Sequence, residues 1–264
     1  IKEAISTKLQ SNPDMAVTVL YAGTGPFATL LIPLVTLFSP AQLNMLLLDI
    51  NPASIAYLSR IIRNFNLEPY ILQVVETDAV TYRIPVQWKP DIILSETMMP
   101  SLKTEPQVSI VANLVGQCPQ VLLVPEMIEV SAVLYNNKQT AGKRFINLET
   151  LLVFTKEAAL KMAAEQQTGD TVFPVTILEV QKPAEPGYSR LALLTRIRVF
   201  NEHFLNYSES SLTIPVFVYN MHSIKTWPAV LNIQYRIFPI PGFTISKDGL
   251  TLFEVKKKEI PIIN

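Results

Sequence analysis

The sequence predicts an α/β fold in which a Rossmann-like, doubly wound parallel sheet is followed by a C-terminal β-barrel or sandwich. Up to Pro125, five short apolar segments alternate with segments of helical periodicity, which is the pattern of a parallel sheet covered by helices. After Pro125, β-type segments follow one another, separated by Pro, Gly, Asn and Lys. We therefore expect two domains, over residues 1–125 and 126–264.

The first domain is expected to contain nine elements. They are helices over residues 1–11, Pro26–Leu37, 51–66 and Glu105–Val115, and strands over Val17–Tyr21, Met45–Asp49, Tyr70–Val75, Asp91–Leu94 and Val121–Val124. Proline near the first turn supports the second helix, and Asn51 before Pro52 is a good N-cap for the third. In the second domain only residues 156–167, "KEAALKMAAEQQ", have a helical pattern.

Composition excludes several classes of protein. Hydrophobic residues make up 49% of the 264 positions and charged residues 17%, so much of the chain must be buried. No apolar run has membrane-spanning length, since even 15–40 is interrupted by Gly, Pro and Thr. Lys+Arg and Asp+Glu balance at 22 each, which argues against a nucleic-acid or membrane-binding surface. One cysteine, two histidines and no visible signal peptide lead us to expect a cytoplasmic protein without a metal site.

The stretch "VLYAGTGPF", residues 19–27, holds two of the eight glycines one residue apart, directly after an apolar segment. Glycine allows positive φ and a close approach of the backbone to a ligand. Gly23 and Gly25 therefore indicate either a cofactor-binding loop or a strand-to-helix turn that binds nothing.

"GTGPFA" also fits the dinucleotide fingerprint in its G-x-G-x-x-A form, and Asp49 ends the second strand where a carboxylate can accept from ribose hydroxyls. NAD and S-adenosyl-L-methionine are both compatible with these features. Asp78 after the third strand and Glu96 after the fourth favour S-adenosyl-L-methionine, because a dehydrogenase needs a second mononucleotide-binding half. Asp49 as a capping or surface residue and Asp78 as a turn residue remain alternatives.

The segment "DIILSETMMPSLKTEPQVSIVANLV" resembles the double-Glu loop of the protein arginine methyltransferases. Glu96 and Glu105 keep the family spacing of nine residues, and Met98 matches the family's methionine. "VLLVPEMIEVSAVL" resembles the passage into that family's β-barrel, and "IKTWPAVLNIQYRI" its Thr-His-Trp segment, with Trp227 at the tryptophan. The resemblance extends with gaps from about residue 17 to 255.

This resemblance implies roles for individual residues. Tyr21, Gly23, Gly25, Asp49, Asp78 and Glu96 would bind S-adenosyl-L-methionine, Glu96 and Glu105 would be catalytic, and Met98 and Trp227 would bind substrate. The acceptor would be an arginine-containing protein or a small molecule, because two carboxylates can hold a guanidinium by forked hydrogen bonds. The family also implies a homodimer, with 156–167 as the best candidate for its dimerisation arm.

Departures from the family pattern leave other functions open. Tyr21 replaces an acidic residue, Phe27 a glycine, "PSLKT" the loop aromatics and Thr226 the histidine. A small-molecule O-, N- or C-methyltransferase and a degenerate binding or dimerisation module are the alternatives. Glu105 could equally be an acid in the first turn of a helix capped by Thr104, and Trp227 a core residue.

Overall fold

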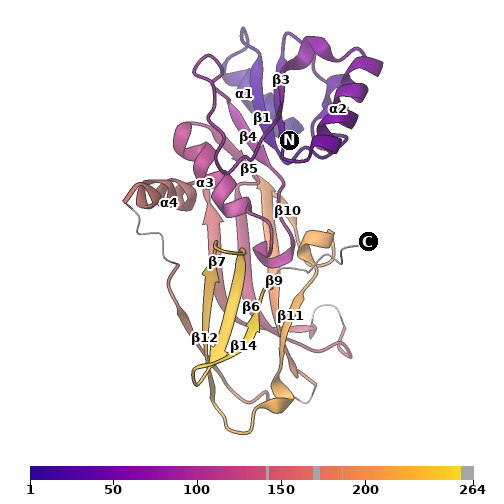
Figure 1. Cartoon of the computed structure of the whole chain (residues 1–264). Coiled ribbons are helices and arrows are strands. Elements are labelled where there is room, and N and C mark those ends of the chain that lie inside the picture. The colour runs from indigo at the N-terminus through magenta and orange to yellow at the C-terminus, as the bar shows by residue number, and fades with distance from the viewer. Residues whose placement is uncertain (141–142, 169–172, 186, 257–264) are drawn as a thin grey trace, which may run out of the picture.

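A computed structural model of the chain describes residues 1–140, 143–168, 173–185 and 187–256. Figure 1 shows an elongated molecule with the parallel sheet, α1 and α2 at one end and the antiparallel strands at the other. Helices α3 and α4 lie where the two parts meet.

The first part is a five-stranded parallel sheet in the order β3-β2-β1-β4-β5. Its strands are β1 (Val17–Ala22), β2 (Leu43–Asp49), β3 (Ile71–Glu76), β4 (Ile92–Ser95) and β5 (Leu122–Val124). Helices α1 (Lys2–Ser11) and α2 (Pro52–Asn64) pack on one face and α3 (Gln107–Gln117) on the other, which confirms the doubly wound arrangement. The Asn51 side chain accepts from Ala53 N and Ser54 N, so the predicted N-cap is confirmed.

The helix predicted over Pro26–Leu37 is wrong. Turns follow Gly25, and only Ile32–Thr36 forms a short 3₁₀ helix, η1. Ala28 has a φ of 42°, outside the right-handed helical region, and Pro33 has no N–H to donate to the preceding turn. Apolar spacing alone therefore overestimated the helical content of this segment.

The second part consists of two antiparallel sheets. One has the order β10-β9-β6-β7 with β11 also paired to β9, and the other has the order β14-β13-β12-β8. Their strands are β6 (Met127–Tyr135), β7 (Phe145–Thr155), β9 (Arg190–Phe200), β10 (His203–Leu205), β11 (Val216–Asn220), β8 (Thr176–Val180), β12 (Ala229–Arg236), β13 (Gly242–Lys247) and β14 (Leu250–Glu254). Because β7 lies beside β8 and β11 beside β14, the sheets form a barrel-like body, as predicted.

Helix α4 (Lys156–Thr168) forms where the sequence predicts it. Its buried residues Ala159 and Met162 belong to the core that α3 also enters, and the two helices pack together. The predicted homodimer and the role of 156–167 as a dimerisation arm stay predictions. The described residues contain no helix long and apolar enough to span a membrane, and no cluster of three His, Cys, Asp or Glu side chains suited to a metal ion.

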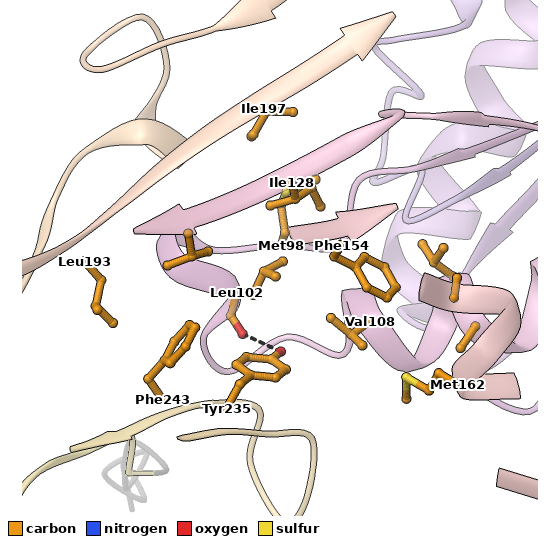
Figure 2. Close-up of a cluster of buried hydrophobic side chains, with 14 of the residues drawn as sticks. Met98, Leu102, Val108, Ile128, Phe154, Met162, Leu193, Ile197, Tyr235 and Phe243 are labelled. Carbon is orange, nitrogen blue, oxygen red and sulfur yellow. Dashed lines mark hydrogen bonds between the residues drawn. The ribbon is translucent and has the colours of Figure 1, made fainter. Parts of the chain in front are cut away.

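The two parts share one hydrophobic core (Figure 2). Met98 and Leu102 come from the loop after β4, and they belong to the same buried cluster as Ile128 and Leu193 of the barrel. Leu102 is only 1% exposed, so the middle of that loop is packed into the barrel. The division at residue 125 stays a prediction, although the parallel strands end with β5 and the antiparallel strands begin with β6. Short 3₁₀ helices complete the connections: η2 (Glu68–Tyr70), η3 (Pro100–Leu102), η5 (Ser211–Thr213) and η6 (Met221–Ser223).

Candidate functional site

The glycine loop follows β1 and is organised by Asp49. Gly23 and Gly25 have φ angles of +82° and +59°, which favour glycine. Asp49 Oδ2 accepts from Gly25 N at 2.7 Å, and Asp49 Oδ1 accepts from Asn51 N at 2.8 Å. The carboxylate therefore joins the end of β2 to the loop, and each of its oxygens keeps a lone pair for a further donor.

Gly23 has a second role that the sequence did not reveal. A Cβ built at this position would lie 2.4 Å from Thr97 Cγ2 and 2.6 Å from the Glu96 carbonyl oxygen. At Gly25 a Cβ would meet no atom within 4 Å. Gly23 is thus required by the close approach of the chain after β4, and Gly25 is the one that leaves open space.

Asp78 lies at the same edge of the sheet. Thr77 N donates to Asp49 O at 2.9 Å, which places the chain after β3 beside the end of β2. Asp78 is exposed, and its Oδ1 accepts from Val80 N at 2.9 Å in a turn. The geometry accommodates both the turn role and a ligand-binding role for this residue.

A cavity of about 370 Å³ opens at the carboxyl ends of β1, β4 and β5, beside the barrel. In a doubly wound sheet, ligands bind where the strand order reverses, which here is between β1 and β4. Tyr21, Glu96 and Met98 line this cavity, so the structure brings three of the predicted residues together. The predicted residues Gly23, Gly25, Asp49, Asp78 and Glu105 lie outside its lining.

The barrel contributes a wall of the cavity that sequence reasoning missed. Val199, Leu205 and the segment 210–212 face it from β9, β10 and the start of η5. Ser210 and Thr213 form a capping box at η5, with Ser210 Oγ accepting from Leu212 N at 3.2 Å. The Ser-x-x-Thr spacing was a local signal for this turn, but nothing in the sequence connected it to Glu96.

The two glutamates are near each other and unpaired. Burial raises the pKa of Glu96 above its ordinary value, and the charge of Glu105 raises it further. Burial also raises the pKa of Glu105. In the part of the chain that the structure describes, neither carboxylate has a hydrogen bond or an ion pair. Such a pair is suited to a cation that would favour both ionised forms.

Tyr21 lines the cavity from β1. The residue is 2% exposed, and burial raises the pKa of its phenol, with the negative charges of Glu96 and Asp49 adding to the shift. The phenol is therefore a neutral hydroxyl at neutral pH, able to donate a hydrogen bond.

The loop that joins Glu96 to Glu105 is strained and is held by the barrel. Ser101, Leu102 and Thr104 have φ angles of 59°, 53° and 66°, a region that non-glycine residues seldom occupy. Ser101 N donates to Thr195 Oγ1 at 2.8 Å, and Tyr235 Oη donates to Leu102 O at 3.0 Å (Figure 2). Thr104 N donates to Pro241 O at 2.8 Å. These tertiary hydrogen bonds offset the strain.

Glu105 is not a first-turn residue of a helix. Helix α3 begins at Gln107 with Pro106 at the N-cap position, and Thr104 makes no cap. The alternative in which Thr104 caps a helix containing Glu105 is therefore wrong, because the positive φ of Thr104 places it in the strained loop.

Trp227 lies apart from the glutamates. It lines a different cavity of about 360 Å³, together with Tyr188 and His222. Tyr235, which contacts the strained loop, is near the end of β12, whereas Trp227 precedes its start. The other histidine, His203, contacts Glu3 Oε2 at 2.7 Å. The structure does not bring Trp227 into the site.

Comparisons with known proteins identify the fold. No family model matches the chain, and a search of curated proteins finds no match. Among solved structures, the Trypanosoma brucei PRMT1 enzyme–prozyme heterotetrameric complex with AdoHcy is similar with a TM-score of 0.58 and 12% identity, over 96% of this chain and 90% of that one. Protein arginine methyltransferase 10 of Arabidopsis thaliana, in an open conformation, has a TM-score of 0.51 and 10% identity, over 96% of this chain and 92% of that one. The chain thus has the fold of these methyltransferases.

Proposed function

We propose that this chain, which has the fold of the protein arginine methyltransferases, is an S-adenosyl-L-methionine-dependent methyltransferase whose acceptor is a guanidino nitrogen. The observation that carries the proposal is the cavity at the crossover of the sheet, which is lined by Glu96, a carboxylate without a hydrogen-bond or ion-pair partner among the described residues. Glu96 lines this cavity, and Glu105 lies outside its lining but close enough for its charge to raise the pKa of Glu96; two neighbouring carboxylates with raised pKa values suit a cationic ligand.

The residues around the glycine loop fit S-adenosyl-L-methionine better than a dinucleotide. A pyrophosphate is usually held at the N-terminus of the helix after the glycine loop, and here turns follow Gly25 instead. S-adenosyl-L-methionine has no phosphate, and the free lone pairs of Asp49 suit its ribose hydroxyls. Gly25, Asp49 and Asp78 would hold the nucleoside, while Tyr21 and Glu96 would face its amino-acid end. When bound, the cofactor supplies an electrophilic methyl group on a sulfonium.

The glutamates would orient the acceptor. The carboxylate oxygens of Glu96 and Glu105 would accept N–H bonds from a guanidinium, as Arg–carboxylate pairs do. Their negative charges would hold the positive charge away from the nitrogen that faces the methyl group. Arrival of the cation would also lower both raised pKa values, because a nearby positive charge favours the ionised carboxylates. Alignment of this kind contributes much of the rate in a displacement.

A small-molecule methyltransferase is the second candidate. The observation in its favour is the apolar lining, since Leu30, Leu94 and Val199 are typical of the cavity walls and no Lys, Arg or His among the described residues lines it. An apolar acceptor with one polar group would match that lining.

Cofactor binding tests the first half of the proposal. Calorimetry with S-adenosylhomocysteine should show binding that Asp49→Ala weakens strongly, because that change removes the ribose partner and releases the loop. Asp91→Ala is the matched control: Asp91 Oδ2 also accepts a backbone N–H, from Thr18 at 2.8 Å, but before β4 at the amino edge of the sheet. Binding of NADH and not of S-adenosylhomocysteine would overturn the assignment.

Methyl transfer tests the second half. Labelled S-adenosyl-L-methionine is supplied with arginine-containing peptides, free arginine and a metabolite extract, and the labelled atom is located by mass spectrometry. Label on a guanidino nitrogen that disappears in Glu96→Gln, but persists in the surface control Glu149→Gln, supports the arginine assignment. Label on oxygen or carbon of a metabolite favours the second candidate. Cofactor binding without transfer to any of these acceptors counts against the guanidino assignment.

A further inference from the structure

The side chain of Gln107 is buried at the site and is not explained by the chemistry above. It is 1% exposed and is the first residue of α3. A buried amide destabilises a protein unless its polar atoms are hydrogen-bonded. The hydrogen-bond partners of Gln107 therefore indicate its role.

All the hydrogen bonds of this amide go to the two residues that flank Glu96. Gln107 Oε1 accepts from Ser95 Oγ at 2.9 Å, from Thr97 N at 3.0 Å and from Thr97 Oγ1 at 2.6 Å. Gln107 Nε2 donates to Ser95 O at 3.1 Å. The Gln107 amide is thus bonded to the residue before Glu96 and to the residue after it, an arrangement that we call the Gln107 bracket.

The bracket also joins the two ends of the strained loop. Thr97 is next to Glu96 at the start of the loop, and Gln107 is two residues after Glu105 at its end. A side chain that binds Thr97 from position 107 therefore fixes the backbone at Glu96 relative to the backbone at Glu105. Thr97 is in turn pressed against Gly23, where an added Cβ would lie 2.4 Å from Thr97 Cγ2.

The glutamate side chains have no support of their own. In the described part of the chain the Glu96 carboxylate makes no hydrogen bond, so its position depends on the backbone that carries it. The Glu96 amide donates to Ala22 O at 3.2 Å, and the Gln107 bracket fixes the residues on either side. A shift of that backbone would pass directly to the carboxylate.

We propose that Gln107 is a positioning residue that sets the separation of the Glu96 and Glu105 carboxylates and their placement beside the glycine loop. The role in catalysis rests on the proposed methyltransferase function, but the separation of the carboxylates is a property of the protein alone. It is therefore measurable without cofactor or acceptor.

The test is a titration of the glutamate carboxyl carbons by NMR, assigned with Glu96→Gln and Glu105→Gln. In the wild type, Glu105→Gln should lower the pKa of Glu96, because it removes a neighbouring negative charge. Methionine has a similar volume to glutamine but no amide. In the Gln107→Met background, the change in the Glu96 pKa that Glu105→Gln causes should fall by about half, because the carboxylates separate and water enters between them. Among the described residues that line the cavity, Tyr21 from β1 is the other titratable side chain, while Val199, Leu205 and the 210–212 segment of the barrel carry no charge.

Gln117 at the other end of α3 is the matched control. Its Oε1 accepts from Ile84 N at 2.9 Å and its Nε2 donates to Tyr82 O at 2.9 Å, so Gln117→Met also removes an amide that holds a loop. It should reduce stability as Gln107→Met does, and leave the dependence of Glu96 on Glu105 unchanged. An unchanged dependence in both variants would overturn the proposal and make Gln107 a structural residue only.

A second variant and a kinetic measurement complete the test. If Gln107→Met does not fold, Thr97→Val removes one donor to the amide oxygen and keeps the methyl group near Gly23, and it should reduce the dependence in the same direction. With an arginine-containing peptide, Gln107→Met should lower kcat/KM by roughly 10²-fold, mainly through kcat, and Gln117→Met should stay within about twofold. If the wild type transfers no methyl group, the proposed function fails while the titration still decides the role of Gln107.

Discussion

Gly23→Ala should destabilise the protein more than Gly25→Ala, although both residues have positive φ and lie in one loop. An L residue in the left-handed region costs about 1–2 kcal/mol, and this term applies to both positions. Only at Gly23 would the new Cβ overlap Thr97 Cγ2 and the Glu96 carbonyl oxygen, at 2.4 and 2.6 Å. Overpacking of this kind adds about 1–3 kcal/mol.

The expected loss in the free energy of unfolding is therefore about 2–5 kcal/mol for Gly23→Ala and about 1–2 kcal/mol for Gly25→Ala. Urea unfolding followed by circular dichroism measures both, provided that the slopes of the transitions agree. Equal losses for the two variants would refute the explanation, because they would show that the chain after β4 yields to a methyl group without cost. The pair thus separates backbone strain from close approach.

Three other outcomes are expected. Tyr235→Phe removes the donor to the buried Leu102 carbonyl, and urea unfolding should show a loss of about 1–2 kcal/mol; no loss would mean that the strained loop is held without this bond. Glu96→Gln should raise the melting temperature at pH 7 and not at pH 4. A carboxyl whose pKa is raised by folding stabilises the protein below its unfolded pKa and loses that stabilisation as the pH rises through its folded pKa. An equal gain in melting temperature at pH 4 and pH 7 would contradict this explanation. Trp227→Ala should leave methyl transfer within about twofold in the labelled assay, since it lines a separate cavity, and a loss comparable to that in Glu96→Gln would place it in the site after all.

Local signals in the sequence predicted the sheet well because each strand is marked by its own residues. The run "MLLLD" and the following Asn51–Pro52 pair define a buried strand and a helix start without reference to the rest of the chain. The segment after Gly25 misled the same reasoning, because its apolar residues have helical spacing but Pro33 and the positive φ of Ala28 prevent the helix.

Parts of the site that depend on distant contacts could not be predicted. The spacing of Glu96 and Glu105 was readable, but the bracket made by Gln107 depends on how α3 docks onto β4. The barrel wall at 210–212 approaches Glu96 across more than a hundred residues of sequence. Trp227 shows the limit of local likeness to a motif, since that likeness predicted substrate binding while the residue lines a separate cavity just before β12.

The left-handed residues Ser101, Leu102 and Thr104 make the link between the glutamates dependent on its surroundings. Each such residue costs about 1–2 kcal/mol, so this decapeptide has no intrinsic preference for the shape it adopts. Its shape is imposed by Thr195, Tyr235 and the 241 carbonyl, all of which belong to the barrel. If the loop were grafted onto another nucleotide-binding sheet, it would therefore lose this conformation. A redesign must include the barrel strands that hold the loop.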